Sequence, residues 1–147
     1  MKVLFICKGN WFRSQIAEAV YNQITKSQDA SSCGTYTGAS DEPEGQVLLN
    51  LLPLAFFEVM ESHGLDLRNN RTRRLTPEML KNADVAVSMA EQPYIPTFLR
   101  MDPKVIWWNV SDGSGDRDIT EATYQKIIGL VRALVDQNME KKSKRRS

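Results

Sequence analysis

The chain of 147 residues is poor in the two side chains that most often carry metal and nucleophilic chemistry. It has a single histidine, His63, and only two cysteines, Cys7 and Cys33. Because zinc sites draw on clusters of histidine and cysteine, we expect no metal site. A Ser-His-Asp triad could be built only around His63. Two cysteines are also too few for a disulfide framework, so a buried core has to hold the fold.

The sequence also lacks an excess of charge and any long apolar run. Its 19 Lys and Arg against 18 Asp and Glu give a formal net charge of +1, too weak a field to predict binding to nucleic acid or a membrane surface. No segment reaches the roughly 18 uninterrupted apolar residues of a membrane span. The apolar start, 1–7, is too short for a signal peptide and breaks at Lys8. We therefore expect a cytoplasmic protein.

Short apolar runs alternate with helical patterns along the chain. Strands are predicted at about 2–6, 31–38, 83–89 and 104–110, and helices at about 13–26, 47–63 with a kink or break at Pro53, 77–82, 91–99 and 118–138. This alternation predicts an α/β fold: a single three-layer domain over 1–140, with a four-stranded parallel, doubly wound sheet and helices on both faces. Ligands of such sheets bind beyond the carboxyl ends of the strands. The basic tail, 141–147, is expected to be disordered.

The segment between the first predicted strand and the first predicted helix carries the chemistry. A cysteine there is followed, after five residues, by an Arg-Ser pair. Backbone N–H groups of a tight loop and the N-terminus of the next helix together bind anions, and their field favours a thiolate at Cys7. Arg13 can hold two phosphate oxygens with its planar fork, and the Ser14 hydroxyl can hydrogen-bond the sulfur. The predicted phosphate-binding residues are Lys8, Gly9, Asn10, Trp11, Phe12, Arg13 and Ser14.

A simpler interpretation of this segment is available. Cys7 could be a small buried side chain that ends a strand, since a cysteine and an arginine at this spacing also occur by chance. That interpretation leaves the Arg13-Ser14 pair at the helix start unexplained. Nucleotide-binding loops are a poor match, because Gly-Lys-Ser/Thr and Gly-x-Gly-x-x-Gly are both missing.

The opening of the chain resembles the signature of the low-molecular-weight protein tyrosine phosphatases, whose fold is shared with the thioredoxin-coupled arsenate reductases. The resembling stretch is 3–19, Val-Leu-Phe-Ile-Cys-Lys-Gly-Asn-Trp-Phe-Arg-Ser-Gln-Ile-Ala-Glu-Ala. Segments 32–35, 63–67, 71–76 and 83–89 are similar to later parts of the same family, in the same order. The resemblance covers nearly the whole chain.

This resemblance implies a role for each residue of the loop. Cys7 would be the nucleophile that forms a phosphocysteine intermediate, Arg13 the phosphate clamp and Ser14 the residue that stabilises the thiolate. Asn10 would take a strained loop position, held by a hydrogen-bond network that includes Ser32.

One member of that implied network departs from the family. Asn70 aligns with a position where the family usually has histidine. Asparagine can still hydrogen-bond there, but it cannot titrate. Ser32 and Asn70 are therefore predicted as supporting residues.

The family protonates the leaving oxygen with an aspartate that follows its fourth strand, in an Asp-Pro dipeptide. Asp112 aligns best with that aspartate, although Gly113 replaces the proline and would make the loop more flexible. Asp116 and Asp118 are further candidates, and Asp118 could equally begin the last helix as a cap.

Two further departures bear on redox chemistry. Phe12 stands where many relatives have a second cysteine, which leaves Cys33 as the only thiol that could pair with Cys7. Arsenate reductases pass oxidation along a relay of cysteines, and the downstream pair is missing here. The simplest interpretation of Cys33 is a buried strand thiol.

The sequence thus predicts a phosphomonoester hydrolase that needs no cofactor, and we expect a protein tyrosine phosphatase. Its substrate would be a phosphotyrosine protein or a small aryl phosphate, and inorganic phosphate or other oxyanions would bind the same loop. Trp11 is the best-placed aromatic wall for such a substrate, because it lies within the loop. The alternatives are an arsenate reductase and a non-catalytic phosphate-binding regulatory module.

Overall fold

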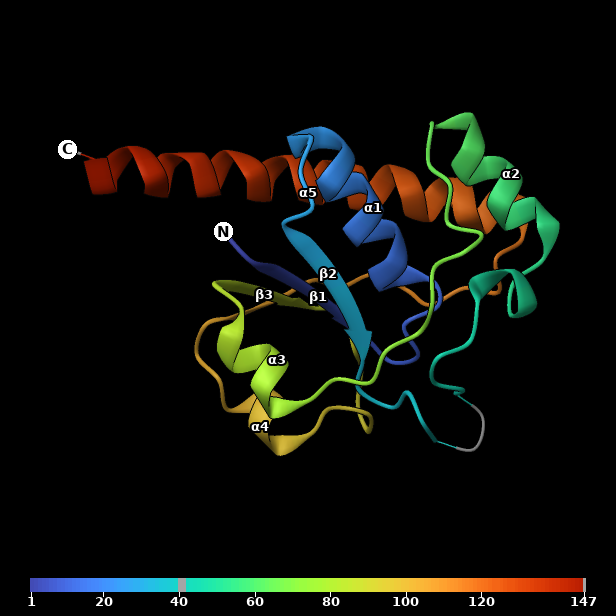
Figure 1. Cartoon of the computed structure of the whole chain (residues 1–147), viewed down its shortest axis with the longest axis horizontal. Coiled ribbons are helices and arrows are strands. Elements are labelled where there is room, and N and C mark those ends of the chain that lie inside the picture. The colour runs from blue at the N-terminus through green and yellow to red at the C-terminus, as the bar shows by residue number, and fades with distance from the viewer. Residues whose placement is uncertain (40–41, 147) are drawn as a thin grey trace.

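Four parallel strands form one sheet in the computed structural model, which describes residues 1–39 and 42–146, with side chains as far as 141. The strands are β1 (Val3–Cys7), β2 (Ala30–Gly34), β3 (Val85–Ser88) and β4 (Val105–Trp107), in the order β2-β1-β3-β4; the first three of these are labelled in Figure 1. Each neighbouring pair is parallel; Val3, for example, pairs with Ala30 on one side and with Val85 on the other. The predicted four-stranded parallel sheet is confirmed.

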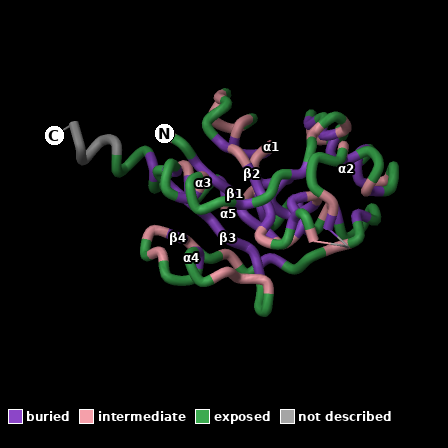
Figure 2. The backbone as a smooth tube through the Cα atoms, turned by 60° about the horizontal axis from the view of Figure 1, so that its bottom comes forward, coloured by how far each residue is buried: buried purple, intermediate pink, exposed green. Residues whose placement is uncertain are grey.

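Helices cover both faces of this sheet, because β1 is apolar on both of its faces. Val3, Phe5 and Cys7 point into a core shared with α1 (Arg13–Thr25), α2 (Leu54–Ser62) and α5 (Arg117–Arg146). Leu4 and Ile6 point into a second core, shared with α3 (Pro77–Asn82) and α4 (Thr97–Arg100). Figure 1 shows α1, α2 and α5 on one side of the sheet and α3 and α4 on the other, and Figure 2 shows β1, β2 and β3 as the buried centre. The three-layer α/β architecture is therefore as predicted.

Proline and threonine set the helix boundaries in the middle of the chain. The pattern around Pro53 becomes two short helices, the 3-10 turn η1 (Leu48–Asn50) and α2, since proline cannot donate the backbone hydrogen bond of a helix interior. The hydroxyl of Thr76 accepts a hydrogen bond from the Met79 N–H and caps α3, with Pro77 in its first turn.

Two predicted helices differ from the structure. The helix expected over 91–99 is wrong: only α4 forms, because Pro93 and Pro96 each remove a backbone donor and disfavour helical backbone in the preceding residue. The last helix, α5, runs on to Arg146, beyond the predicted end at Asn138.

The chain after Asn138 holds neither glycine nor proline and is rich in lysine and arginine, which favour helix. The backbone of 141–146, expected to be disordered, therefore continues α5 as a helix. Its end projects past the rest of the molecule (Figure 1). Ser147 and the side chains of 142–146 lie outside the described part of the chain, and the domain limit at 140 stays a prediction. None of the described helices has the length and apolar character needed to cross a membrane.

Parallel strands bring their carboxyl ends to one edge of the sheet. The segment after β1 leads into α1, the segment after β3 begins at Met89, and the segment after β4 runs from Trp108 to the start of α5. All three leave the same edge, so residues far apart in the sequence meet there.

Candidate active site

Cys7 is the last residue of β1 and its side chain is buried. The N–H of Asn10 donates a hydrogen bond to Cys7 Sγ at 3.3 Å, and Ser14 Oγ lies 3.0 Å from the same sulfur. The loop from Cys7 to Ser14 therefore curls back over its own cysteine, as the phosphate-loop prediction requires.

Backbone donors of this loop are left over for a ligand. Within the described part of the chain, the N–H groups of Gly9, Trp11 and Phe12 form no hydrogen bond with a protein acceptor. They lie just before the N-terminus of α1, where the first N–H groups of a helix also lack partners within the helix. Unpaired N–H groups next to a helix N-terminus are a suitable site for an anion.

Asn10 has a φ of 60°, in the left-handed region where asparagine costs less than most other side chains. Its side-chain amide holds this conformation. Asn10 Oδ1 accepts a hydrogen bond from the N–H of Arg73 at 2.8 Å, and this backbone donor fixes which end of the amide is oxygen. The Nδ2 group then donates to Ser14 Oγ at 2.8 Å and to Ser32 Oγ at 2.9 Å.

The orientation of this amide also sets the direction of the serine hydrogen bonds. Ser14 Oγ accepts from Asn10, so its own proton is available to Cys7 Sγ, and when the cysteine is a thiolate the hydroxyl is the only donor between the two atoms. Ser32 Oγ likewise accepts from Asn10 and donates to Glu18 Oε1 at 3.2 Å. Burial raises the pKa of Glu18. The network thus holds the Ser14 hydroxyl beside the Cys7 sulfur.

Asn70 reaches the loop through another side chain, that of Gln15. Its Nδ2 group donates to Gln15 Oε1 at 3.2 Å, and Gln15 Nε2 donates to the Asn10 carbonyl at 3.1 Å and to the Arg71 carbonyl at 3.2 Å. Gln15 is itself buried. Neither Gln15 nor Glu18 was among the predicted site residues; both lie in the first turns of α1, on the side that faces the loop.

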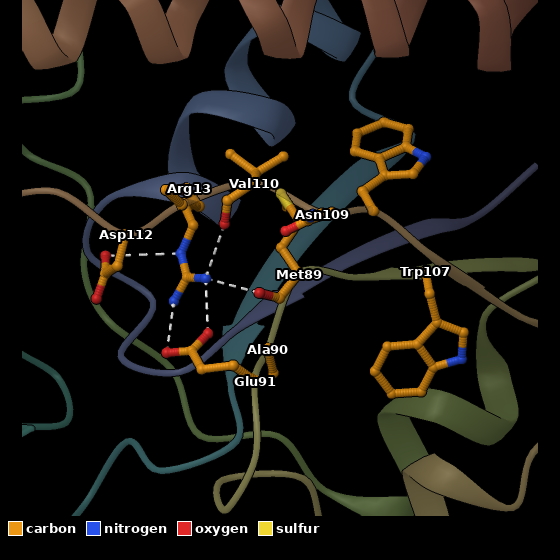
Figure 3. Close-up of a pocket in the computed structure, with 10 residues that line it drawn as sticks. Arg13, Met89, Ala90, Glu91, Trp107, Asn109, Val110 and Asp112 are labelled. Atoms are coloured by element: carbon orange, nitrogen blue, oxygen red, sulfur yellow. Dashed lines mark hydrogen bonds and ion pairs between the residues drawn. The ribbon is translucent and has the colours of Figure 1, made fainter.

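Arg13 begins α1, and only 2% of its surface is exposed. Its Nη1 group donates to the carbonyls of Met89 at 2.6 Å and Val110 at 3.1 Å, and to Glu91 Oε2 at 2.7 Å. Nη2 lies 3.4 Å from Glu91 Oε1. Figure 3 shows these groups around the end of the guanidinium, with Asp112 beside Nε.

The Nε–H of Arg13 is buried and has no hydrogen-bond partner among the described residues; Asp112 Oδ1 is 3.6 Å away. Burial acts to lower the pKa of Arg13, but the negative charges of Cys7, Glu91 and Asp112 outweigh it, and the pKa lies above its ordinary value. Arg13 is therefore a fixed cation whose Nε–H remains available to a ligand.

Only one of the three candidate acids faces this arginine. Asp112 lies in the segment after β4, two residues beyond Val110; its side chain is 41% exposed and lies beside Arg13. Asp116 Oδ1 accepts from the N–H of Ile119 at 2.9 Å and so caps α5, whereas Asp118 is in the first turn of that helix. The cap is Asp116 rather than Asp118, since α5 begins at Arg117.

The glycine after Asp112 is explained by packing. A Cβ atom on Gly113 would lie 2.9 Å from Phe12 Cε2 and 2.6 Å from Ile119 Cγ2, closer than real Cβ contacts allow. Phe12 is buried and packs against Phe56, with ring centroids 5.8 Å apart. The loop that carries Asp112 therefore rests on a side chain of the phosphate loop, which restricts it more than a glycine alone suggests.

Glu42 holds the outer side of the phosphate loop and was not predicted. Its Oε2 accepts from Trp11 Nε1 at 2.8 Å, and its Oε1 is 3.3 Å from Lys8 Nζ. Lys8 Nζ also lies 4.2 Å from the ring centroid of Tyr94. A Cβ atom on Gly9 would overlap the Glu42 carboxylate and the Trp11 indole, so a side chain there would displace their contact. The loop around Glu42 carries no motif that could have signalled this contact.

Cys33 lies on the other face of the sheet from Cys7. In the β1–β2 register Cys33 pairs with Ile6 and Gly34 pairs with Cys7, so the two thiols enter different cores. Both thiols are free, and burial strongly raises the pKa of Cys33. Cys33 is therefore a buried strand thiol on the opposite face of the sheet from the Cys7 sulfur.

A family model described as "Low molecular weight phosphotyrosine protein phosphatase" matches residues 2–145. The chain belongs to this family. The resemblance drawn from the sequence is thereby confirmed, and the family match together with the Cys7 loop supports a cysteine-dependent phosphatase.

This phosphatase-family chain is also similar to individual proteins. It is 28% identical over 92 residues to a "Protein-arginine-phosphatase" of Bacillus subtilis (strain 168); the match covers 63% of this chain and 57% of that protein. Its structure superposes on a low molecular weight protein tyrosine phosphatase from T. tengcongensis with a TM-score of 0.74 at 24% identity, covering 93% of this chain and 99% of the other.

A third likeness is to the YwlE arginine phosphatase from Geobacillus stearothermophilus. The TM-score is 0.77 at 17% identity, and the match covers 97% of this chain and 96% of the other. At such identities the two structural likenesses show the fold alone.

Proposed function

We propose that this family member is a protein tyrosine phosphatase that hydrolyses phosphomonoesters through a phosphocysteine on Cys7. The proposal rests on hydrogen-bond donors of Arg13 and of the Cys7 loop that have no protein acceptor in the described part of the chain. The buried Nε of Arg13 and the N–H groups of Gly9, Trp11 and Phe12 all lack protein acceptors among the described residues. Buried donors without partners are costly, and a bound phosphate would pair them.

The proposed reaction has two steps. In the first, the Cys7 thiolate attacks phosphorus, the bond to the leaving oxygen breaks, and Asp112 donates its proton to that oxygen. In the second, water attacks the phosphocysteine, the Asp112 carboxylate takes a proton from that water, and the S–P bond breaks. The electron pair returns to Cys7 Sγ, which the Ser14 O–H stabilises. Arg13 and the loop amides hold the phosphoryl oxygens in both steps.

Oxyanion binding in this loop is supported by two relatives of the same fold. The Wzb protein of Vibrio vulnificus was solved in complex with benzylphosphonate, and the tyrosine phosphatase Wzb of Escherichia coli K30 in complex with sulphate. We propose that inorganic phosphate and similar oxyanions bind the loop of this chain in the same way.

Phosphoarginine is a second candidate substrate. The similar protein from Bacillus subtilis is described as a protein-arginine phosphatase. The side chains of Asp112 and Glu91 are 41% and 45% exposed, so two carboxylates border the phosphate site and could accept from a guanidinium leaving group. Peptides of one sequence that carry either phosphotyrosine or phosphoarginine would separate the candidates by the ratio of their kcat/KM values.

The test is hydrolysis of p-nitrophenyl phosphate in reductant and chelator by the wild type, Cys7→Ser and Asp112→Asn. We expect turnover by the wild type, none by Cys7→Ser, and slow turnover with intact phosphate binding by Asp112→Asn. Undiminished turnover by Cys7→Ser would overturn the mechanism. Phosphate binding without turnover by the wild type would favour the regulatory module, and activity that depends on thioredoxin and Cys33 would favour the arsenate reductase.

A further inference from the structure

We propose that Glu91 is a positioning residue, which sets the edge of the Arg13 guanidinium that is offered to phosphate. The inference rests on the proposed function of the Cys7 loop. Glu91 lies in the segment after β3, and its carboxylate contacts both terminal nitrogens of Arg13, at 2.7 Å (Nη1) and 3.4 Å (Nη2).

The protein contacts of Arg13 occupy one edge of its guanidinium and leave another edge available. The carbonyls of Met89 and Val110 bind Nη1 alone, so they hold one corner of the guanidinium but leave its plane free to tilt. The Glu91 carboxylate bridges Nη1 and Nη2 and so fixes the plane. The donors that remain are Nε–H and the second hydrogen of Nη2, which share the other edge. This is the edge at which Nε has no partner among the described residues.

A two-point grip on phosphate needs both donors of that edge in a fixed direction. Because the guanidinium is planar, the Glu91 contact with Nη1 and Nη2 also fixes the direction of the edge that carries Nε–H and the second hydrogen of Nη2. Without it, Nη1 would keep its two carbonyls, but the plane could tilt and only one phosphate oxygen could be held well. We therefore expect loss of Glu91 to weaken phosphate binding.

The charge of Glu91 acts in the opposite direction. A carboxylate close to an anion site repels a dianion, so removal of this charge by itself would tighten phosphate binding. If Glu91 were merely a repelling charge or a competitor for Arg13, its loss would strengthen phosphate binding. The sign of the change thus separates positioning from repulsion.

Substitution at this site leaves the fold little affected. The Glu91 side chain is 45% exposed and borders a cavity of about 530 Å³, together with Arg13, Asp112 and Trp107 (Figure 3). It packs into neither core cluster. Glu91→Gln keeps its volume and an acceptor oxygen, and Glu91→Ala removes the contact altogether.

The experiment measures inorganic phosphate binding by calorimetry, and KM and kcat with p-nitrophenyl phosphate. Glu58→Gln is the matched control, since it removes a carboxylate from a surface ion pair with Arg117. We expect the phosphate Kd and the KM to rise about tenfold in Glu91→Ala and less in Glu91→Gln, with kcat changed less than about threefold, because Arg13 binds phosphate in both the ground state and the transition state. Glu58→Gln should match the wild type.

An unchanged or lower phosphate Kd in both Glu91 variants would overturn the proposal. If Glu91 only supported the fold, its substitution would lower the fraction of active protein and so give a smaller burst of p-nitrophenol. The protein that stayed active would keep the wild-type Kd and KM, and that result would also overturn the proposal. The calorimetric measurement needs no turnover. If the wild type binds phosphate but does not hydrolyse esters, the proposed function is refuted, whereas the phosphate Kd values of the Glu91 variants still test the role of Glu91.

Discussion

Removal of the Ser14 hydroxyl tests the derived direction of the hydrogen bonds around the nucleophile. Ser14→Ala deletes the contact with Cys7 Sγ at 3.0 Å and the bond from Asn10 Nδ2 at 2.8 Å. A hydrogen bond to a charged group contributes about 1.5–3 kcal/mol, which corresponds to about 10- to 150-fold in rate. The thiolate is the leaving group when the phosphocysteine breaks down, so the loss should fall on that second step.

Rapid-quench kinetics with p-nitrophenyl phosphate would resolve the two steps. For Ser14→Ala we expect a burst of p-nitrophenol equal to the enzyme concentration, followed by slow turnover as the phosphocysteine accumulates. Ser32→Ala is the matched control, because it removes the other hydroxyl bound to the same amide, at 2.9 Å, without touching the sulfur. A kcat for Ser14→Ala within about twofold of the wild type, or equal to that of Ser32→Ala, would refute the reasoning.

Three further predictions follow from the same contacts. Asp112→Asn should lower kcat for phosphotyrosine by about 10²–10⁴-fold, while phosphate inhibition stays intact; turnover equal to that of the wild type would show that Asp112 is not the acid. In Cys33→Ala, inactivation by peroxide should proceed as in the wild type, since burial raises the pKa of Cys33 and its side chain faces the other core; a Cys7–Cys33 disulfide detected by mass spectrometry would contradict this. Burial raises the pKa of Glu18 above its ordinary value of 4.5, so the ionised side chain opposes folding at neutral pH and this cost disappears as the pH falls below that value. Urea unfolding should therefore show Glu18→Gln to be more stable than the wild type at pH 7, with the difference vanishing near pH 4; an equal difference at both values would argue against it.

The parts of the fold and site that depend on local signals could be predicted. The apolar run of β1, the punctuation at Gly9 and Asn10 and the helix start at Arg13 are adjacent in sequence, so the strand, loop and helix could be inferred together. The segments after β1 and β4 were placed at the same edge because parallel strands end there, and Asp112 does face Arg13. The cap of α3 at Thr76 is equally local.

The contacts that depend on distant loops could not be predicted. Glu42 lies 31 residues from Trp11, and Glu91 lies 78 residues from Arg13; each comes from a loop without a motif. Two glutamates among the 18 acidic residues of the chain look no different from those on the surface. Cys33 could be assigned to its face only once the strand register was known, because a shift of one residue would exchange the two faces.

The contact between Phe12 and Gly113 has a consequence for exchanging parts between relatives. The phenyl ring occupies the space that any side chain at 113 would need. A proline restored at 113 would collide with the Phe12 ring and with Ile119 unless smaller residues replaced both. We therefore expect that the phosphate loop and the loop that carries Asp112 can be exchanged between relatives only together. A chimera that receives one of them should lose general-acid catalysis while it still binds phosphate.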